Sequence, residues 1–252
     1  MDFLETILEE KRKEVRKMPL EIEREVPKRV SFYDLVMNHP ERIHVIGEMK
    51  RSSPSKGKIN HHVEAVQQAK KYEEAGVSAI SVLTDPTFFK GSIDDLYEIS
   101  LEITTPLLCK DFIISEKQLI RAKNNGASMV LLIVAALELK EITHLFHQAK
   151  KLDLEVLVET HNQKELEIAE ALGAKIIGVN NRNLKTFDVS IEVSEAIQLN
   201  RKEVCYISES GFQTKEDVER IASKFNGILV GETLMKSPDI LQTLEDLRVI
   251  RK

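Results

Sequence analysis

The sequence has no run close to the ~20 consecutive apolar residues that a transmembrane helix requires, and its two cysteines have no C-x-x-C spacing. Cys109 and Cys205 each stand within an apolar run, so we expect two buried thiols in a reducing compartment rather than a disulfide or a nucleophile. The segment MDFLETILEEKRKEV at the N-terminus has too many acidic residues for a signal or transit peptide. These shortages predict a cytoplasmic protein with no membrane partner.

The chain also has no excess of positive charge. It carries 36 Lys and Arg against 41 Asp and Glu, a formal net charge of −5, which argues against binding to nucleic acid or to an anionic membrane. Any positive charge that binds an anionic substrate must therefore be local. With 252 residues, of which 42% are hydrophobic and 31% charged, the chain is long enough for one large α/β domain.

Short apolar, β-branched runs alternate with longer amphipathic stretches after residue 42, which is the pattern of repeated βα units. Eight strands are predicted, at 43–50, 77–84, 106–110, 128–134, 155–159, 175–180, 204–209 and 227–231. Helices are predicted near 61–75, 92–103, 115–125, 138–152, 162–172, 190–199, 214–224 and 237–250. Eight units close a barrel, so the sequence predicts an α/β fold of the (β/α)8 TIM-barrel class. We expect one domain over residues 1–252, with an N-terminal helical extension in 1–42 and the eight units in 43–252.

Glycine supplies a second periodicity. One glycine precedes every second predicted strand: Gly76, Gly126, Gly173 and Gly227 in turn. Each is expected to end a helix in the left-handed conformation, which glycine adopts at little cost. Such a two-unit repeat suits a closed eightfold barrel. A doubly wound open sheet, the alternative, would place a glycine-rich phosphate turn after the first strand, where the sequence reads KRSSPSKGK without G-x-G-x-x-G.

The extension in residues 1–42 has its own helical pattern. Apolar residues recur there at three- and four-residue steps and form one stripe on a charged helix: Phe3, Leu4, Ile7, Leu8, Val15 and Met18. We expect this stripe to pack on the barrel. The stretch EEKRKEVRK in the same helix is expected to be an exposed face with i,i+4 ion pairs.

Active sites of such barrels lie where the strands end on the carboxyl side. Six polar or charged residues stand at these predicted ends: Glu48, Lys50, Lys110, Glu159, Asn180 and Glu209. Because side chains alternate along a strand, Ile46, Glu48 and Lys50 share one face, and placing that face in the barrel interior lets all six converge. Rim charges can simply pair and close a barrel, but six at strand ends favour a site with general acids and bases.

A phosphate site is indicated separately by the loops after the seventh and eighth strands. These loops contain Ser210-Gly211 and Gly231-Glu232, and barrels often bind phosphate at this position. Glycine lets backbone N–H groups approach an anion closely, and a following helix N-terminus adds partial positive charge. The matched pair of glycines in the matched loops indicates an anion site.

At these residues the chain resembles the indole-3-glycerol-phosphate synthase family over nearly its whole length. The resemblance rests on eight blocks in the family's order and spacing: IGEMKRSSPSKG (46–57), ISVLTDPTFFKGS (80–92), LLCKDFII (107–114), VLLIVAAL (130–137), VLVETHN (156–162), IGVNNRNLKTF (177–187), ISESGF (207–212) and LVGETLM (229–235). Other phosphate-binding barrels share the ESG and GE segments, but not EMKRSSPS or CKDF.

The resemblance implies ring closure of 1-(o-carboxyphenylamino)-1-deoxyribulose 5-phosphate with loss of carbon dioxide and water, the indole-forming step of tryptophan biosynthesis, without cofactor or metal. It implies that Lys110 is the general acid that protonates the keto oxygen. Glu159 and Glu48 would transfer protons during dehydration, and Lys50 would tune Glu48 and attract the anionic substrate. We expect the second lysine and partial burial to lower the pKa of Lys110 so that it can release its proton.

The resemblance also implies the remaining lining of the site. Its polar lining would be Asn180, Arg182, Glu209 and Ser210. Phosphate would rest on the backbone of Gly211, Gly231 and Glu232, with contacts from Lys50 and Ser53. An apolar slot for the anthranilate ring would come from Phe89, Phe112, Leu131, Ile133 and Leu184.

Two other functions stay open at this point. One is a Schiff-base aldolase with Lys110 as its nucleophile, and the other is a catalytically silent barrel that only binds sugar phosphates. The complete set of Lys110, Glu159 and Glu48 argues against a silent barrel. The expected partner is a small-molecule substrate, and we expect a monomer or a weak oligomer.

Histidine does not indicate a metal site. His144 and His147 lie three residues apart on a predicted helix and His161 follows the fifth strand, but no further ligand has the spacing of a metal motif. We therefore expect no bound metal.

Overall fold

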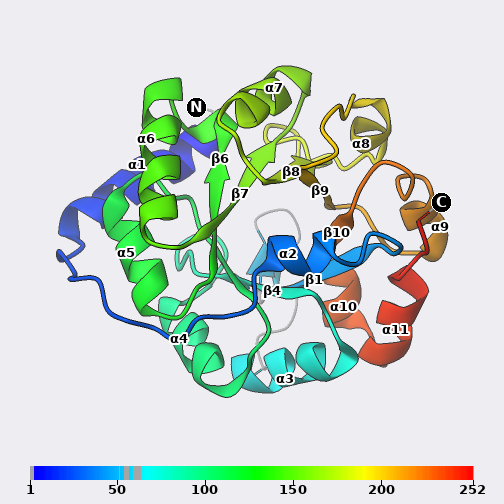
Figure 1. The fold of residues 1–252 in the computed structure, drawn as a ribbon. Coiled ribbons are helices and arrows are strands. Elements are labelled where there is room, and N and C mark those ends of the chain that lie inside the picture. Colours follow the sequence, from blue (N-terminus) through cyan, green and yellow to red (C-terminus); the bar gives the residue numbers. More distant parts are fainter. Residues whose placement is uncertain (1–2, 51, 54–56, 59–63, 252) are drawn as a thin grey trace.

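Eight parallel strands close into a barrel in the computed structural model, which describes residues 3–50, 52–53, 57–58 and 64–251. Around the barrel the order is β1-β10-β9-β8-β7-β6-β5-β4. The strands are β1 (His44–Met49), β4 (Ala79–Leu83), β5 (Leu107–Lys110), β6 (Met129–Ile133), β7 (Glu155–Thr160), β8 (Ile176–Asn180), β9 (Cys205–Glu209) and β10 (Gly227–Val230). The predicted (β/α)8 fold is confirmed (Figure 1). The connection after β1 also contains a short antiparallel pair, β2 (Ser52–Ser53) and β3 (Gly57–Lys58).

Helices surround the strands (Figure 1). They are α3 (Ala65–Ala75), α4 (Ile93–Glu102), α5 (Glu116–Asn124), α6 (Leu139–Lys151), α7 (Gln163–Ala171), α8 (Glu192–Ala196), α9 (Lys215–Glu219), α10 (Glu232–Lys236) and α11 (Ile240–Leu247), with the 3-10 turn η1 (Val134–Ala136) after β6. α8 and α9 are shorter than their predicted ranges of 190–199 and 214–224. Among the described residues, none of the helices is both long and apolar enough to cross a membrane.

The predicted last helix near 237–250 is present as α11, but the prediction missed α10, which precedes it. Ser237, Pro238 and Asp239 separate the two helices. Proline disfavours the helical conformation in the residue before it, and Ser237 is extended with ψ of 130°. Asp239 then begins α11 by accepting the N–H of Gln242 at 3.0 Å.

Three of the four glycines have the predicted conformation. Gly76, Gly126 and Gly173 end helices with φ of 81°, 86° and 74°. The prediction for Gly227 is wrong, because this residue begins β10 and is not in the left-handed region. A Cβ at Gly227 would lie 2.7 Å from the carbonyl oxygen of His44, so glycine there permits β1 and β10 to approach closely.

Apolar side chains pack in two layers. The inner layer fills the barrel and includes Ile46, Leu108, Leu131, Leu157 and Ile207. The outer layer lies between strands and helices and includes Ile80, Leu132 and Ile177. Cys109 and Cys205 are buried free thiols, as predicted. Because Ile46 belongs to the inner layer, strand alternation directs Glu48 toward the same interior.

The N-terminal extension contributes helices to both ends of the barrel. α1 (Phe3–Lys17) lies at the carboxyl ends of the strands, where its Ile7 is buried and borders a cavity. α2 (Phe32–Met37) closes the amino end, where Phe32 and Val36 join the inner layer. Glu155, the first residue of β7, accepts the N–H of Phe32 at 2.8 Å. The extension thus packs on the barrel as predicted.

One prediction about α1 is wrong. The stretch EEKRKEVRK is not a uniformly exposed face, because the side chain of Lys11 is only 1% exposed. Its ammonium nitrogen contacts the carboxylates of Glu14, Asp85 and Asp111. The two aspartates follow β4 and β5 and are distant in sequence, so local charge pattern could not show them.

Candidate active site

A cavity of about 1370 Å³ opens at the carboxyl ends of the strands. This volume accommodates a small-molecule substrate. Its wall includes a set of the predicted polar residues: Glu48, Lys50, Lys110, Asn180, Arg182, Glu209, Ser210 and Glu232. Gly211 and Gly231 belong to the same wall. The structure therefore brings together residues from β1, β5, β8, β9 and β10.

Lys110 is the centre of the charged network. Its ammonium nitrogen lies 2.5 Å from Glu209 Oε2 and 3.1 Å from Glu159 Oε2. The side chains of the two glutamates are 1% and 4% exposed. Unpaired charges buried to this degree would be very costly, so the lysine and its two carboxylates depend on one another.

The expectation of a lowered pKa for Lys110 is wrong. Burial lowers this pKa, but the carboxylates of Glu209, Glu159 and Glu48 outweigh burial and raise it above its ordinary value. Lys50, which was expected to lower it, pairs instead with Glu48, with 2.5 Å between Lys50 Nζ and Glu48 Oε1. Lys110 is consequently held as a positively charged ammonium.

Three neighbouring side chains surround the carboxylate of Glu159. Besides Lys110, the side-chain amide of Asn180 donates to Glu159 Oε1 at 3.2 Å. His161 Nε2 is also 3.2 Å from Glu159 Oε1, although the ring is not aligned for a hydrogen bond. Burial alone would raise the pKa of Glu159, but Lys110, His161 and Asn180 lower it below its ordinary range. Glu159 does not itself border the cavity and reaches it through Lys110 and Asn180.

His161 is a charged partner that sequence reasoning did not assign. Its Nδ1 lies 3.0 Å from Glu165 Oε2, and Glu165 also accepts the backbone N–H of His161 at 2.8 Å. Burial lowers the pKa of His161, but the two glutamates raise it to about 10. His161 is therefore an imidazolium at neutral pH. The signal was its position two residues after Glu159 on the same strand end.

Glu209 occupies space that a glycine leaves open. A Cβ at Gly178 would lie 2.1 Å from Glu209 Oε1, and this oxygen has no hydrogen-bond partner among the residues that the structure describes. Burial raises the pKa of Glu209, and Lys110 opposes that rise. Gly178 was not singled out from the sequence, yet a glycine inside a strand commonly marks such a close approach.

Glu48 has a similar arrangement at β1. Its side chain is 5% exposed and pairs with Lys50. A Cβ at Gly231 would lie 2.8 Å from Glu48 Oε1. Gly231 therefore leaves room for the Glu48 carboxylate, in addition to bordering the cavity.

Asn180 joins the β8 end to the β9 end. Its Oδ1 accepts the backbone N–H of Arg182 at 3.0 Å and the hydroxyl of Ser210 at 3.0 Å. Asn181 donates to the Ser210 carbonyl at 2.9 Å. Ser210 has a positive φ of 70°, followed by Gly211 at 101°. A serine held in this region is strained by roughly 1–3 kcal/mol, which the surrounding hydrogen bonds offset.

Apolar side chains form another part of the cavity wall. Four of the five predicted slot residues border the cavity: Phe89, Phe112, Leu131 and Leu184. The ring centroids of Phe89 and Phe112 are 6.1 Å apart. The fifth, Ile133, is buried in the inner layer and does not border the cavity. The side chain of Ser53 lies outside the described part of the structure.

The sequence did not reveal the part of this wall that α1 supplies. Phe3, Leu4 and Ile7 border the cavity, and the Phe3 ring packs edge-on against Phe88 and Phe187 at centroid distances of 5.7 and 4.8 Å. Periodicity identified these residues as an apolar stripe, but it could not show which end of the barrel they cover. In the part of the chain that the structure describes, no cluster of His, Cys, Asp and Glu could hold a metal ion.

The fold and the site together define a (β/α)8-barrel protein with an ionised lysine and carboxylates at the catalytic end of the barrel. This is the architecture of barrel enzymes. Among solved structures, one that is similar in fold alone is a 3-hexulose-6-phosphate synthase, with a TM-score of 0.63, 14% identity, and coverage of 81% of this chain and 98% of that chain.

Sequence comparison identifies the family. The family model for indole-3-glycerol phosphate synthase matches residues 4–247. The indole-3-glycerol phosphate synthase of Listeria welshimeri is 58% identical over 243 residues, 95% of this chain and 96% of the relative. That of Streptococcus pneumoniae is 51% identical over 249 residues, 98% of both chains. The chain belongs to the indole-3-glycerol phosphate synthase family, whose members are lyases of tryptophan biosynthesis that act on a small-molecule substrate.

Proposed function

We propose that this chain closes the pyrrole ring of 1-(o-carboxyphenylamino)-1-deoxyribulose 5-phosphate, releasing carbon dioxide and water, with Lys110 as general acid. The observation that carries the proposal is the position of Lys110. Its ammonium lies between Glu159 and Glu209 at the wall of the cavity. Family membership supplies the reaction class, and the geometry supports the roles of the individual groups.

In the first step, the ring carbon that bears the carboxylate attacks the keto carbon of the sugar chain. A carbon–carbon bond forms, and the carbonyl π electrons move to oxygen. The Lys110 ammonium stabilises this oxyanion and donates a proton to it. A raised pKa suits this role, because the lysine stays protonated until a strongly basic oxyanion develops. Loss of carbon dioxide then returns its bonding electrons to the ring and restores aromaticity.

In the second step, the new hydroxyl leaves as water. One proton must reach that hydroxyl, and one must leave the neighbouring CH₂ carbon that is bonded to nitrogen. We assign these transfers to Glu159 and Glu48, whose carboxylates belong to β7 and β1 on different sides of the barrel. Asn180 orients Glu159, and Lys50 orients Glu48.

Substrate binding is assigned to the rest of the cavity wall. The phosphate would accept backbone N–H groups from the loops of Gly211, Gly231 and Glu232, with positive charge from Lys50. The aromatic ring would lie between the Phe89 and Phe112 side of the wall and the polar network. Arg182 and Ser210 complete the polar lining. The barrel and its extension are proposed to act as one domain.

The ionisation of Lys110 distinguishes the proposal from a Schiff-base aldolase. An amine attacks a carbonyl only in its neutral form, and the three carboxylates around Lys110 favour the charged form. The same network argues against a silent barrel, because its buried charges are costly to hold and binding alone does not require them.

The test is to add the carboxyphenylamino-deoxyribulose phosphate to the purified chain and follow indole fluorescence. The chain contains no tryptophan, so the indole signal is that of the product. We expect turnover by the unaltered chain and a loss of about 10²–10⁴-fold in Lys110→Met. Lys175→Met is the control, because Lys175 lies over the Tyr33 ring, 4.9 Å from its centroid, near the amino end of the barrel.

Two results would overturn the proposal. One is the absence of product from the unaltered chain. The other is near-normal turnover by Lys110→Met. Borohydride reduction in the presence of substrate separates the aldolase, since a covalent adduct at Lys110 would establish a Schiff base.

A further inference from the structure

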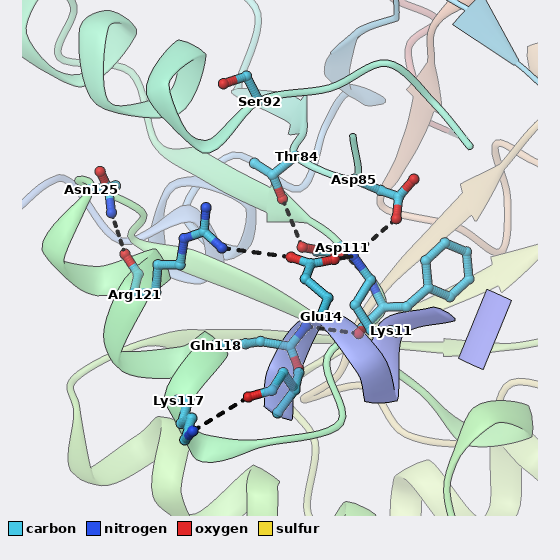
Figure 2. Close-up of polar contacts among 12 residues, drawn as sticks. Lys11, Glu14, Thr84, Asp85, Ser92, Asp111, Lys117, Gln118, Arg121 and Asn125 are labelled. Atoms are coloured by element: carbon cyan, nitrogen blue, oxygen red, sulfur yellow. Dashed lines mark hydrogen bonds and ion pairs between the residues drawn. The ribbon is translucent and has the colours of Figure 1, made fainter. Parts of the chain in front are cut away.

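Lys11 of α1 is a buried cation outside the proposed reaction. Its side chain is 1% exposed, and its ammonium nitrogen lies 2.7 Å from Glu14, 2.8 Å from Asp111 and 2.9 Å from Asp85 (Figure 2). Glu14 belongs to the same helix, whereas the two aspartates belong to separate barrel loops. Such burial of an ammonium is tolerable only when its charge and all its protons are paired.

Asp85 stabilises the conformation of the loop between β4 and α4. It is 1% exposed, and its Oδ1 accepts the backbone N–H groups of Phe88 at 2.6 Å and Phe89 at 3.3 Å. Its other oxygen, Oδ2, faces Lys11. One carboxylate therefore connects the buried lysine to the segment that places the Phe89 ring at the cavity.

Asp111 does the same for the loop between β5 and α5. Its Oδ1 accepts the backbone N–H of Phe112 at 2.7 Å, and its Oδ2 accepts the Thr84 hydroxyl at 3.2 Å. Asp111 also directly follows Lys110 in the chain. The residues on either side of Asp111 are thus a cavity-lining aromatic ring and the proposed general acid.

The two aspartates would repel each other without a cation between them. The pKa of Asp111 is raised, chiefly by burial, while Lys11 lowers it. Burial lowers the pKa of Lys11, but Asp111, Asp85 and Glu14 raise it above its ordinary value. At neutral pH Lys11 therefore remains a positively charged ammonium between the two loops that carry Asp85 and Asp111.

We propose that Lys11 is a positioning residue, whose ammonium joins the β4–α4 and β5–α5 loops so that Phe89, Phe112 and Lys110 keep their relative positions around the aromatic ring of the substrate. α1 accordingly contributes to the geometry of the active site and not only to the stability of the barrel. This inference rests on the proposed function, because the rate of indole formation is its readout.

The test compares two lysines that both anchor α1. Lys11→Met removes the link between the aspartates and keeps a side chain of similar length. Lys117→Met is the matched control, because Lys117 of α5 donates to the carbonyls of Met18 at 2.8 Å and Val15 at 3.3 Å without contacting either aspartate. Both changes loosen α1, and only the first releases the loops.

The measurements are the single-turnover rate of indole formation with enzyme in excess, the KM, and the melting temperature. We expect both variants to melt at lower temperature. At a temperature where both are folded, Lys11→Met should form indole about 10- to 100-fold more slowly, the usual effect of misplacing reacting groups by about 1 Å. Lys117→Met should keep the rate of the unaltered chain, and Lys11→Arg should retain more of it than Lys11→Met.

A second variant tests the same inference if Lys11→Met does not fold. Asp85→Asn keeps an oxygen for the Phe88 and Phe89 N–H groups and leaves Lys11 paired with Asp111 and Glu14, so it removes only the charge that links the loops. We expect a slower single-turnover rate in this variant too. Equal rates for Lys11→Met and Lys117→Met, or an unchanged rate in Asp85→Asn, would overturn the inference. Absence of indole formation by the unaltered chain would instead overturn the proposed function.

Discussion

Gly178→Ala tests the buried charge network with a single methyl group. Gly178 is buried in β8, and a Cβ there would lie 2.1 Å from Glu209 Oε1, whereas real Cβ contacts stay beyond 3.0 Å. The carboxylate oxygen must therefore move by about 0.9 Å, the difference between 3.0 and 2.1 Å. Its partner oxygen, 2.5 Å from Lys110 Nζ, must move with it. A shift of about 1 Å in reacting groups costs roughly 100-fold in rate.

We expect Gly178→Ala to lower kcat/KM by about 100-fold, which corresponds to ~2.7 kcal/mol of transition-state stabilisation. The free energy of unfolding should fall by about 1–3 kcal/mol, the usual effect of overpacking. Indole fluorescence measures the first quantity, and urea denaturation measures the second. Gly173→Ala is the control, because among the described residues no heavy atom outside Gly173 and its two chain neighbours lies within 4 Å of a Cβ there, although its φ is +74°. It should lose about 1–2 kcal/mol through backbone strain and keep its activity.

A double variant identifies the cause. Glu209→Asp shortens the acid by one methylene, so Gly178→Ala combined with Glu209→Asp should be more active than Gly178→Ala alone if the clash is responsible. If Gly178→Ala matches Gly173→Ala in kcat/KM, the carboxylate is not confined as the structure has it, and the reasoning is refuted.

Two further predictions concern the neighbour of Glu159 and the amino end of the barrel. His161→Gln removes a positive charge 3.2 Å from Glu159. The pKa of Glu159 should then rise, so the fall of kcat/KM on the acidic side of its pH profile should move to higher pH by about one unit or more. A fall that stays in place would show that His161 does not act on this carboxylate. Phe32→Ala should lower the free energy of unfolding by about 3–5 kcal/mol, because the ring is fully buried in the inner layer. Calorimetry measures that change, and indole formation below the melting temperature should stay normal; reduced activity without a lower melting temperature would contradict the assignment of α2 to stability.

Part of the site followed from strand alternation. The alternating pattern of β1 placed Glu48 and Lys50 on the interior face, and the structure has both at the cavity. Alternation cannot give distances between strands, however. The pairing of Lys110 with Glu159 and Glu209, rather than its approach to Lys50, reversed the expected direction of its pKa shift.

The apolar wall shows the same limit. The resemblance implied Phe89 and Phe112 as slot residues, and both border the cavity. It implied Ile133 equally, but Ile133 lies in the inner layer. Phe3, by contrast, was assigned to a packing stripe, and it borders the cavity. Position along a strand or helix gives the face of a side chain, but not its depth.

The sequence alone determined the number of βα units, the interior face of the first strand, and the end of the barrel where polar residues gather. These properties depend on local periodicity and on residues close in the chain, so they can be read without coordinates. Only the tertiary structure decided which charges pair, which glycines leave room for carboxylates, and that Lys11 reaches two loops 74 and 100 residues further along the chain. Those properties depend on distances between segments that become neighbours when the barrel closes, and a few ångströms decide whether a charge is neutralised or left buried alone.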